Sequence, residues 1–185
     1  MAWDVYLFNF VNSFAGRFGA FDALGVFGAV FLLPLLGFLL LPAAFTIKRI
    51  KEAHWYEMPL HALLAALLAY AARSGLGALV GRARPFVALP DTQLLIPMDH
   101  LYDSFPSGHA ALSFALAYIV FKHDRDWGIA FFILAAVVAV SRVFVGVHFP
   151  VDVLFGAVVG ILAGWIVQRF EKAEWRKIER ALKVR

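Results

Sequence analysis

The sequence predicts an all-α fold, a polytopic membrane helix bundle of about five transmembrane helices with an interfacial helix at the N-terminus. Hydrophobic residues make up 62% of the 185 residues and charged residues 16%, against about 45–50% and about 25% in soluble domains. Five runs of 16 to 25 residues carry at most one charge each, and about 20 apolar residues suffice for a helix to cross a bilayer. A water-soluble, buried all-helical protein is the alternative, but these runs leave too little polar surface for a soluble shell.

Residues 1–20 are predicted to form a short interfacial helix that lies on the membrane. Aromatic residues alternate there with small or polar ones (Trp3, Tyr6, Phe8 and Phe10), and a frayed terminus is the alternative. A secretory signal is not expected, because no basic residue comes before Arg17. The predicted spans follow at residues 23–47, 58–81, 104–121, 127–149 and 153–168, and residues 150–151 can extend the last one.

The segments between these spans carry unequal numbers of basic residues. Twelve Lys and Arg lie on the side that holds residues 48–57, 122–126 and the tail 169–185, against three on the side of 1–22, 82–105 and 146–150. Lys and Arg favour the cytoplasmic side. The sequence therefore predicts one membrane-embedded domain over 1–185 in the cell (inner or plasma) membrane, with a cytoplasmic C-terminus. The basic, amphipathic tail is expected to rest on anionic headgroups as a cytoplasmic helix.

Three glycines at four-residue spacing in the last span form a small-residue face that lets helices approach closely (Gly156, Gly160 and Gly164). Packing inside the monomer is the expected use of this face. Dimerisation is the alternative, so the sequence leaves the oligomeric state open between monomer and dimer.

Unusual polar residues collect near the outer ends of four spans under this topology. Arg84 follows the second span, Ser107, Gly108 and His109 open the third, Arg142 lies near the end of the fourth, and His148 and Asp152 open the fifth. Ionisable groups this close to hydrocarbon are costly and usually paired or functional. The third and fifth helices point their N-termini outward, which favours an anion, and guanidinium groups grip phosphate oxygens. The cluster therefore predicts a site for a tetrahedral, multiply charged anion.

The spacing of His148 and Asp152 suggests nucleophilic chemistry. The two residues are four apart and share a face if the helix has begun at His148. A carboxylate beside an imidazole fixes its tautomer, and an oriented imidazole can attack phosphorus, while His109 is free to protonate the leaving oxygen. A metal site built from these three residues is the alternative, but two nearby arginines would repel a divalent cation. The chain has no cysteine, and neither a metal nor a cofactor is expected.

These residues resemble the three signature segments of the type-2 phosphatidic acid phosphatase superfamily. The segments are RP at 84–85, PSGH at 106–109, and SR at 141–142 followed by a histidine at 148 and an aspartate at 152. The resemblance implies that His148 is the nucleophile that forms a phosphohistidine, that Asp152 orients it, and that His109 is the general acid. It also implies phosphate binding by Arg84, Ser107, Gly108 and Arg142, and metal-independent hydrolysis of phosphate or diphosphate groups, commonly of lipids.

One position departs from the family pattern. The first signature of the family begins with a lysine seven residues before the arginine of RP, and that position is Gly77 here. Arg73, one turn deeper on the same face, and Arg82, near the outer surface, are the possible replacements. Side chains lean toward the N-terminus of a helix, so Arg73 would have to reach against that lean.

Residues 7–24 and 84–110 are similar to the bacitracin-resistance branch of undecaprenyl-diphosphate phosphatases. This resemblance implies conversion of undecaprenyl diphosphate to undecaprenyl phosphate at an outward-facing site. Phosphatidate, phosphatidylglycerol phosphate and lipid A phosphate are alternative substrates, and a non-catalytic lipid-phosphate binder or transporter is the alternative function. The expected partners are the lipid phosphate and membrane lipids, with no nucleic acid.

Overall fold

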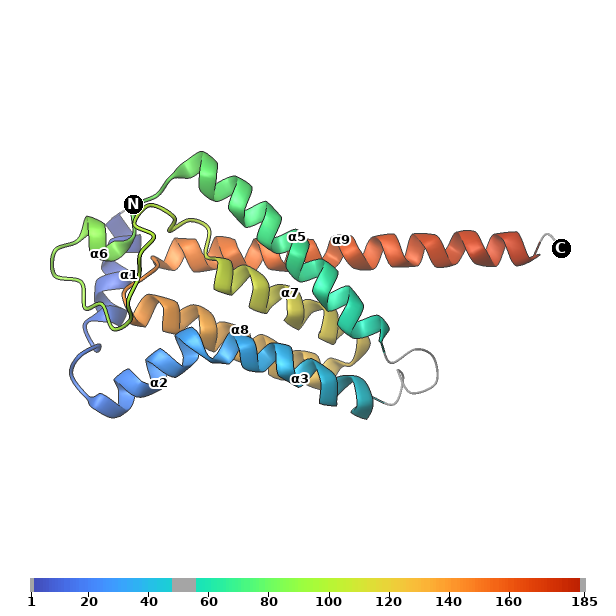
Figure 1. Cartoon of the computed structure of the whole chain (residues 1–185), viewed down its shortest axis with the longest axis horizontal. Helices are drawn as coiled ribbons and strands as arrows, with labels where there is room; N and C mark the ends of the chain where they lie inside the picture. Colours follow the sequence, from blue (N-terminus) through green and yellow to red (C-terminus); the bar gives the residue numbers. More distant parts are fainter. Residues whose placement is uncertain (1, 48–55, 184–185) are drawn as a thin grey trace.

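The fold is a helical bundle with smaller elements gathered across one end (Figure 1). The computed structural model describes residues 2–47 and 56–183, with 172–183 placed as backbone only. The helices in these ranges are α1 (Ala2–Asn12), α2 (Gly19–Val30), α3 (Leu32–Thr46), α5 (Glu57–Val80), α6 (Pro85–Ala88), α7 (Gly108–His123), α8 (Arg125–Phe144) and α9 (Pro150–Lys183). The predicted all-α class is confirmed. The end of the bundle that holds α1, α6 and residues 89–107 is called the capped end below.

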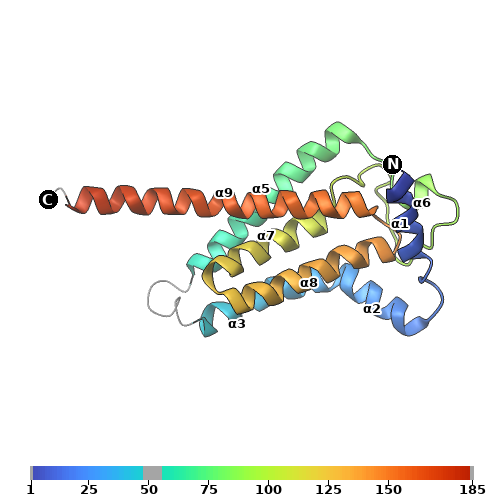
Figure 2. The same ribbon diagram turned by 180° about the vertical axis from the view of Figure 1, so that it is seen from behind.

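Helix α7 is the central element of the bundle. It packs on α5, α8 and α9, and these four helices lie side by side in both views (Figures 1 and 2). Its buried face is rich in alanine, which lets its neighbours approach closely. In the short turn into α8, Asp124 caps that helix by accepting hydrogen bonds from the backbone N–H groups of Asp126 and Trp127 at 3.0 Å each.

The first predicted span, 23–47, is not one straight helix. It consists of α2 and α3, which meet at Phe31 with a bend of 59°. Pro34 explains the break, because it has no N–H for the carbonyl four residues earlier and its ring clashes there. In the first turn of α3 the missing donor costs nothing.

Helices long and apolar enough to cross a bilayer number three within the described ranges: Glu57–Ala88, Arg125–Phe144 and Pro150–Glu171. A fourth is added if the bent pair α2–α3 counts as one span. The predicted third span, 104–121, corresponds to α7, which has 16 residues and is enclosed by its neighbours. About five spans were expected. By length and composition the structure has three or four, and α7 is an additional short helix in the centre of the bundle.

Helix α9 packs on α7 through the predicted glycine face. A Cβ at Gly156 would lie 2.5 Å from the carbonyl oxygen of Ser107, and one at Gly160 would lie 2.2 Å from that of Ala111. Only glycine allows the two backbones to approach this closely. The expected packing inside the monomer is therefore confirmed.

The tail predicted at 169–185 is not a separate helix in the described residues. It continues α9 without a break to Lys183 and projects beyond the rest of the bundle, so that α1 and the end of α9 lie at opposite ends (Figures 1 and 2). Its placement on anionic headgroups stays a prediction.

Helix α1 covers the capped end, where it packs on α8 and α9. The side chain of Phe8 is fully buried, and its ring lies 5.3 Å from the ring of Phe149. Asp4 and Asn12 are buried on the same face, whereas Tyr6 and Phe10 are exposed. The sequence predicted a helix here but not that a charged residue would be its buried anchor.

Candidate active site

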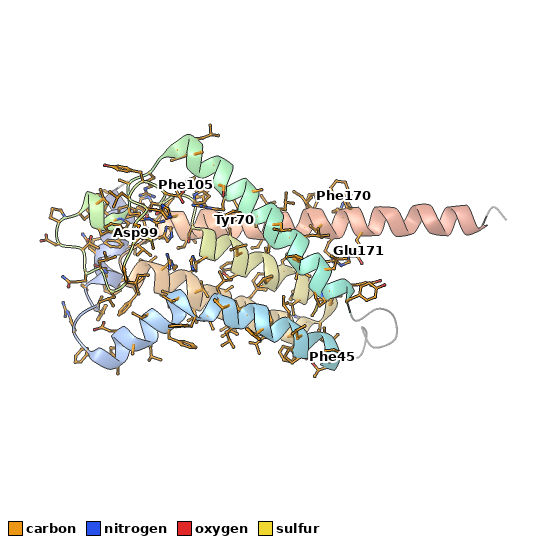
Figure 3. All side chains as sticks on the ribbon, in the orientation of Figure 1. Phe45, Tyr70, Asp99, Phe105, Phe170 and Glu171 are labelled. Atoms are coloured by element: carbon orange, nitrogen blue, oxygen red, sulfur yellow. The ribbon has the colours of Figure 1, made fainter. Side chains whose placement is uncertain are left out.

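The residues singled out in the sequence converge at the capped end, where side chains crowd between the helix ends (Figure 3). Asp99 and Phe105 mark this end in the figure, and Phe45 marks the opposite one. His148 lies in the turn that joins α8 to α9 and is 2% exposed. Gly146 makes this turn possible, because its φ of 87° is in the left-handed region and a Cβ there would lie 2.6 Å from the carbonyl oxygen of Gln93.

The partners of His148 define its tautomer. Nδ1 lies 2.7 Å from the carbonyl oxygen of Ser104, and Nε2 lies 3.2 Å from Nη1 of Arg84. A carbonyl can only accept and a guanidinium can only donate. We therefore assign the proton to Nδ1, which leaves the lone pair on Nε2 facing Arg84.

Asp152 lies in the first turn of α9, but it does not contact the imidazole directly. The shortest separation between Asp152 Oδ2 and His148 Nδ1 is 3.9 Å. Oδ2 instead accepts hydrogen bonds from Ser104 Oγ at 2.6 Å and from the backbone N–H of Phe149 at 2.8 Å. The four-residue spacing thus brings the carboxylate near Nδ1, as expected, and Ser104 adds a second link, because its hydroxyl contacts the carboxylate and its carbonyl contacts the ring.

Burial lowers the pKa of the His148 imidazole to about 4, while Asp152 acts to raise it and the charges of Arg142 and Arg84 act to lower it. The imidazole is therefore neutral near pH 7, and Nε2 is unprotonated beside Arg84. A buried histidine in this state is suited to act as a nucleophile or a base.

Two buried donors next to this turn lack protein partners. Among the described residues, only three buried side-chain nitrogen or oxygen atoms make no hydrogen bond, and Ser107 Oγ and Arg142 Nε are two of them. Arg142 is otherwise held by Nη1, which donates to the carbonyl oxygen of Ala29 at 3.1 Å. Buried polar atoms are nearly always paired, so these two are available to a ligand that accepts hydrogen bonds.

Arg84 and His109 complete the group. Arg84 donates to the carbonyl oxygens of His100 at 2.6 Å and Val147 at 3.0 Å, which fixes its guanidinium beside His148. His109 lies in the first turn of α7 and interacts electrostatically with Arg142, His148 and Arg84. The charges of Arg84 and Arg142 thus lie close enough to His109 and His148 to interact with both rings, near the N-termini of α7 and α9, and helix N-termini and guanidinium groups both favour an oxyanion.

Arg73 reaches this group despite the backward lean of helical side chains. It pairs with Asp103 through two contacts of 2.7 and 3.0 Å, and its Nε lies 3.3 Å from the carbonyl oxygen of Pro106. A Cβ at Gly108 would lie 3.5 Å from Arg73 Nε, so the guanidinium lies directly over the PSGH segment. At Gly77 a Cβ would lie 2.7 Å from Asp103 Oδ1, so this carboxylate occupies the space that a side chain at that position would need.

Arg82, the other possible replacement for the family's lysine, is engaged elsewhere. Its two terminal nitrogens contact Asp152 Oδ1 and Asp4 Oδ2, each at 2.5 Å. Both donors therefore point at carboxylates behind the imidazole.

Three residues of this site did not emerge from the sequence motifs: Asp4, Asp103 and Ser104. Asp4 could have been noticed, because it is the only acidic residue among the first ten, which are mostly apolar, and a charge in such a segment needs a partner. Ser104 carried no signal, because a serine at the start of a predicted span is common. In the described part of the chain, no group of three or more His, Cys, Asp or Glu has the arrangement of a metal site.

The bundle and this cluster define a class: a helical membrane protein with a buried histidine beside buried arginines at one end of the bundle. A sequence model of the PAP2 superfamily matches residues 59–176, and the chain belongs to this superfamily. The resemblance noted in the signature segments is thereby confirmed.

Characterised relatives and solved structures agree with this membership. The chain is 35% identical over 111 residues to the bacitracin transport permease protein BcrC of Bacillus licheniformis, covering 60% of this chain and 54% of that protein. It is 40% identical over 88 residues to the undecaprenyl-diphosphatase BcrC of Bacillus subtilis, covering 47% and 44%. The chain thus spans about half the length of these curated relatives.

Two solved structures share the fold over most of their length. The crystal structure of Aquifex aeolicus LpxE matches with a TM-score of 0.71 and 30% identity, covering 91% of this chain and 96% of that one. A transmembrane PAP2-type phosphatidylglycerolphosphate phosphatase from Bacillus subtilis matches with a TM-score of 0.67 and 26% identity, covering 93% and 86%.

Proposed function

We propose that this protein is a membrane lipid phosphatase that removes the terminal phosphate of undecaprenyl diphosphate through a phosphohistidine on His148. The observation that carries the proposal is the pair of contacts made by His148, with Nε2 at 3.2 Å from Nη1 of Arg84 and Nδ1 at 2.7 Å from the Ser104 carbonyl oxygen. A fixed, neutral imidazole beside phosphate-binding donors is the arrangement that nucleophilic attack on phosphorus requires.

In the first step, His148 Nε2 attacks the terminal phosphorus, and the bond from phosphorus to the bridging oxygen breaks. The negative charge of the bound diphosphate favours the protonated form of His109, which donates this proton to the leaving oxygen, so that the lipid monophosphate departs. Charge that develops on the phosphoryl oxygens is stabilised by Arg84, Arg142 and the Ser107 hydroxyl. Arg73, whose guanidinium lies over Gly108 and pairs with Asp103, takes the place of the family's lysine in this proposal.

In the second step, water attacks the phosphohistidine and His109 takes a proton from it. The bond between phosphorus and Nε2 breaks, inorganic phosphate leaves, and His148 returns to its neutral form. The positive charge of the phosphorylated ring is stabilised by the Ser104 carbonyl and by the carboxylate of Asp152. No step uses a metal ion.

Undecaprenyl diphosphate is proposed because the B. subtilis relative, 40% identical over its matched region, is named an undecaprenyl-diphosphatase. The names of other relatives support alternatives, since they include a lipid A 4'-phosphatase and a phosphatidylglycerophosphatase B. Phosphatidate belongs to the same class of substrate. The excess of basic residues at 48–57, 122–126 and 169–185 supports a site outside the cytoplasm.

The test is phosphate release by purified protein from undecaprenyl diphosphate, undecaprenyl phosphate, phosphatidate, phosphatidylglycerol phosphate and lipid A in one detergent. We expect the diphosphate to have the highest kcat/KM, and His148→Ala to lower it about 1,000-fold or more. Orthovanadate should inhibit, and EDTA should not. Near wild-type activity of His148→Ala would rule out the nucleophile, and a strong preference for a monophosphate would overturn the substrate.

A binder or transporter is the second candidate, because the B. licheniformis relative is named a transport permease protein. Proteoliposomes containing lipid diphosphate separate the two functions. Translocation of the intact lipid without phosphate release would select transport, whereas phosphate release selects the phosphatase.

A further inference from the structure

Three charged side chains form a row behind the candidate nucleophile: Asp4 of α1, Arg82 just after α5, and Asp152 of α9. Arg82 lies in the middle and contacts one oxygen of each carboxylate at 2.5 Å. Asp4 is 1% exposed and Asp152 is fully buried. The sequence separates Asp4 from Arg82 by 78 positions and Arg82 from Asp152 by 70, so only the fold brings them together.

Asp4 also holds the start of α9. Its second oxygen accepts a hydrogen bond from the backbone N–H of Val151 at 2.9 Å, the residue next to Asp152. An N-terminal N–H of a helix needs such an acceptor, and a carboxylate there is stabilised by the helix dipole. The guanidinium of Arg82 lies over the Phe149 ring, 4.2 Å from its centroid. The turn that carries His148 and the first turn of α9 are thus fixed from one side by α1.

The row has a definite charge. Two carboxylates and one guanidinium sum to one net negative charge, and that charge lies behind the imidazole. When His148 is phosphorylated its ring becomes positive, so a net negative charge on this side stabilises the intermediate and the transition state that leads to it. Burying a carboxylate without a partner costs desolvation free energy. Arg82 offsets this cost because it pairs with both carboxylates, and the row still keeps one net negative charge.

We propose that Asp4 and Arg82 are positioning residues for the reaction, acting on His148 through Asp152. The proposal rests on the proposed function, because it assigns these residues to the phosphohistidine chemistry. It makes α1 a part of the active site, and it gives Arg82 a role behind the nucleophile instead of on the phosphate.

The test is a double-mutant cycle of Asp4→Asn and Arg82→Gln, with kcat and KM measured for phosphate release from a detergent-soluble prenyl diphosphate. Asp4→Asn makes the row neutral, and we expect kcat to fall about 10-fold, the effect of losing one charged hydrogen bond. Arg82→Gln leaves two buried carboxylates together, and we expect a loss of about 100-fold. Neither residue touches the substrate, so KM should change less than about 3-fold.

The double variant Asp4→Asn/Arg82→Gln shows whether the two residues position the reacting groups or only support the fold. It restores one net negative charge on Asp152, so its kcat should exceed that of Arg82→Gln alone. Losses that simply multiply, with the double variant worse than either single one, would overturn the charge argument. If Arg82→Gln does not purify as a monodisperse protein, Arg82→Lys replaces it in the cycle. A lysine at position 82 can pair with only one carboxylate at a time, so Asp4 and Asp152 compete for it. Asp4→Asn removes this competition, and the lysine then pairs with Asp152. We therefore expect Asp4→Asn to raise the kcat of Arg82→Lys.

Asp22→Asn is the matched control. It also removes one carboxylate and one hydrogen bond near α1, since Asp22 accepts from the backbone N–H of Gly16 at 2.9 Å, but it contacts none of the site residues described above. We expect its kcat to match wild type. A loss equal to that of Asp4→Asn would show a general disturbance of the N-terminal region and overturn the proposal. His148→Ala separates this result from the proposed function. If His148→Ala is inactive while the Asp4 and Arg82 variants keep the wild-type kcat, only the positioning role is wrong.

Discussion

Ser104 contacts both His148 and Asp152, whose nearest charged atoms lie 3.9 Å apart. Its carbonyl oxygen lies 2.7 Å from His148 Nδ1, and its hydroxyl lies 2.6 Å from Asp152 Oδ2. The carboxylate therefore orients the imidazole through a serine whose backbone and side chain face opposite partners. This differs from a direct carboxylate–imidazole contact, and it divides the orienting role between a backbone group that mutation cannot remove and a hydroxyl that it can.

Ser104→Ala should lower kcat without abolishing activity. The variant loses the hydrogen bond to Asp152, worth about 1.5–3 kcal/mol for a charged acceptor, but keeps the carbonyl that holds Nδ1. We expect kcat to fall about 10-fold to 100-fold, with little change in KM. Ser113→Ala is the control, since Ser113 is equally buried but bonds only the Ala110 carbonyl within α7. An unchanged kcat for Ser104→Ala would contradict the indirect orientation.

Acid should destabilise the fold through His148. Its pKa is about 4 in the folded protein against about 6.5 when unfolded, so the unfolded chain binds the extra proton. The stability contributed by the neutral ring is present above pH 6.5 and is lost as the pH falls through 6.5 toward 4, at about 1.4 kcal/mol per pH unit. Thermal unfolding in detergent at pH 7 and pH 5 measures this. His148→Gln should lose less stability over that interval than wild type, and an equal loss would contradict the assignment.

The space at Gly77 should be intolerant of a side chain. Gly77→Ala places a Cβ 2.7 Å from Asp103 Oδ1, so the carboxylate must move and Arg73 moves with it. We expect kcat/KM to fall about 10-fold or more, because the guanidinium over Gly108 shifts. Gly75→Ala on the same helix has nothing within 4 Å of its Cβ and should retain wild-type activity. Equal activity of the two variants would show that Asp103 and Arg73 have no fixed role.

Gly77→Lys should also fail to improve the enzyme, although it recreates the family's lysine. The new side chain would compete with Asp103 for the same space, and the existing Arg73–Asp103 pair would be displaced. The comparison is kcat/KM of Gly77→Lys against wild type on the same lipid diphosphate. An increase would mean that Arg73 does not replace the missing lysine.

Packing of α9 on α7 should depend on Gly160. A Cβ there would lie 2.2 Å from the backbone carbonyl oxygen of Ala111, and backbone cannot move aside cheaply. Gly160→Ala should cost about 1–3 kcal/mol through overpacking and lower the Tm in detergent. Gly37→Ala, with no atom within 4 Å of its Cβ, should leave the Tm unchanged or raise it slightly. An unchanged Tm for Gly160→Ala would contradict the close approach.

Much of the fold was accessible from hydropathy and motifs, and the exceptions have local causes. The apolar runs predicted α5, α8 and α9 because a helix that faces lipid must be apolar all round. The break at Phe31 was missed, since Pro34 lies inside an uninterrupted apolar run and hydropathy does not register backbone donors. The length of α7 was overestimated because residues 104–107 are apolar or small without being helical.

The amino-acid sequence alone determined that this chain is a membrane helix bundle of the PAP2 superfamily with its polar motif residues at one end. Those properties follow from local composition and spacing, which act along a single helix. Only the tertiary structure decided that Ser104 mediates between His148 and Asp152, that Arg73 lies over Gly108, and that Asp4 holds Arg82. These contacts join distant segments over a few ångströms of side-chain reach, and they exist only after helix packing has set the distances between backbones.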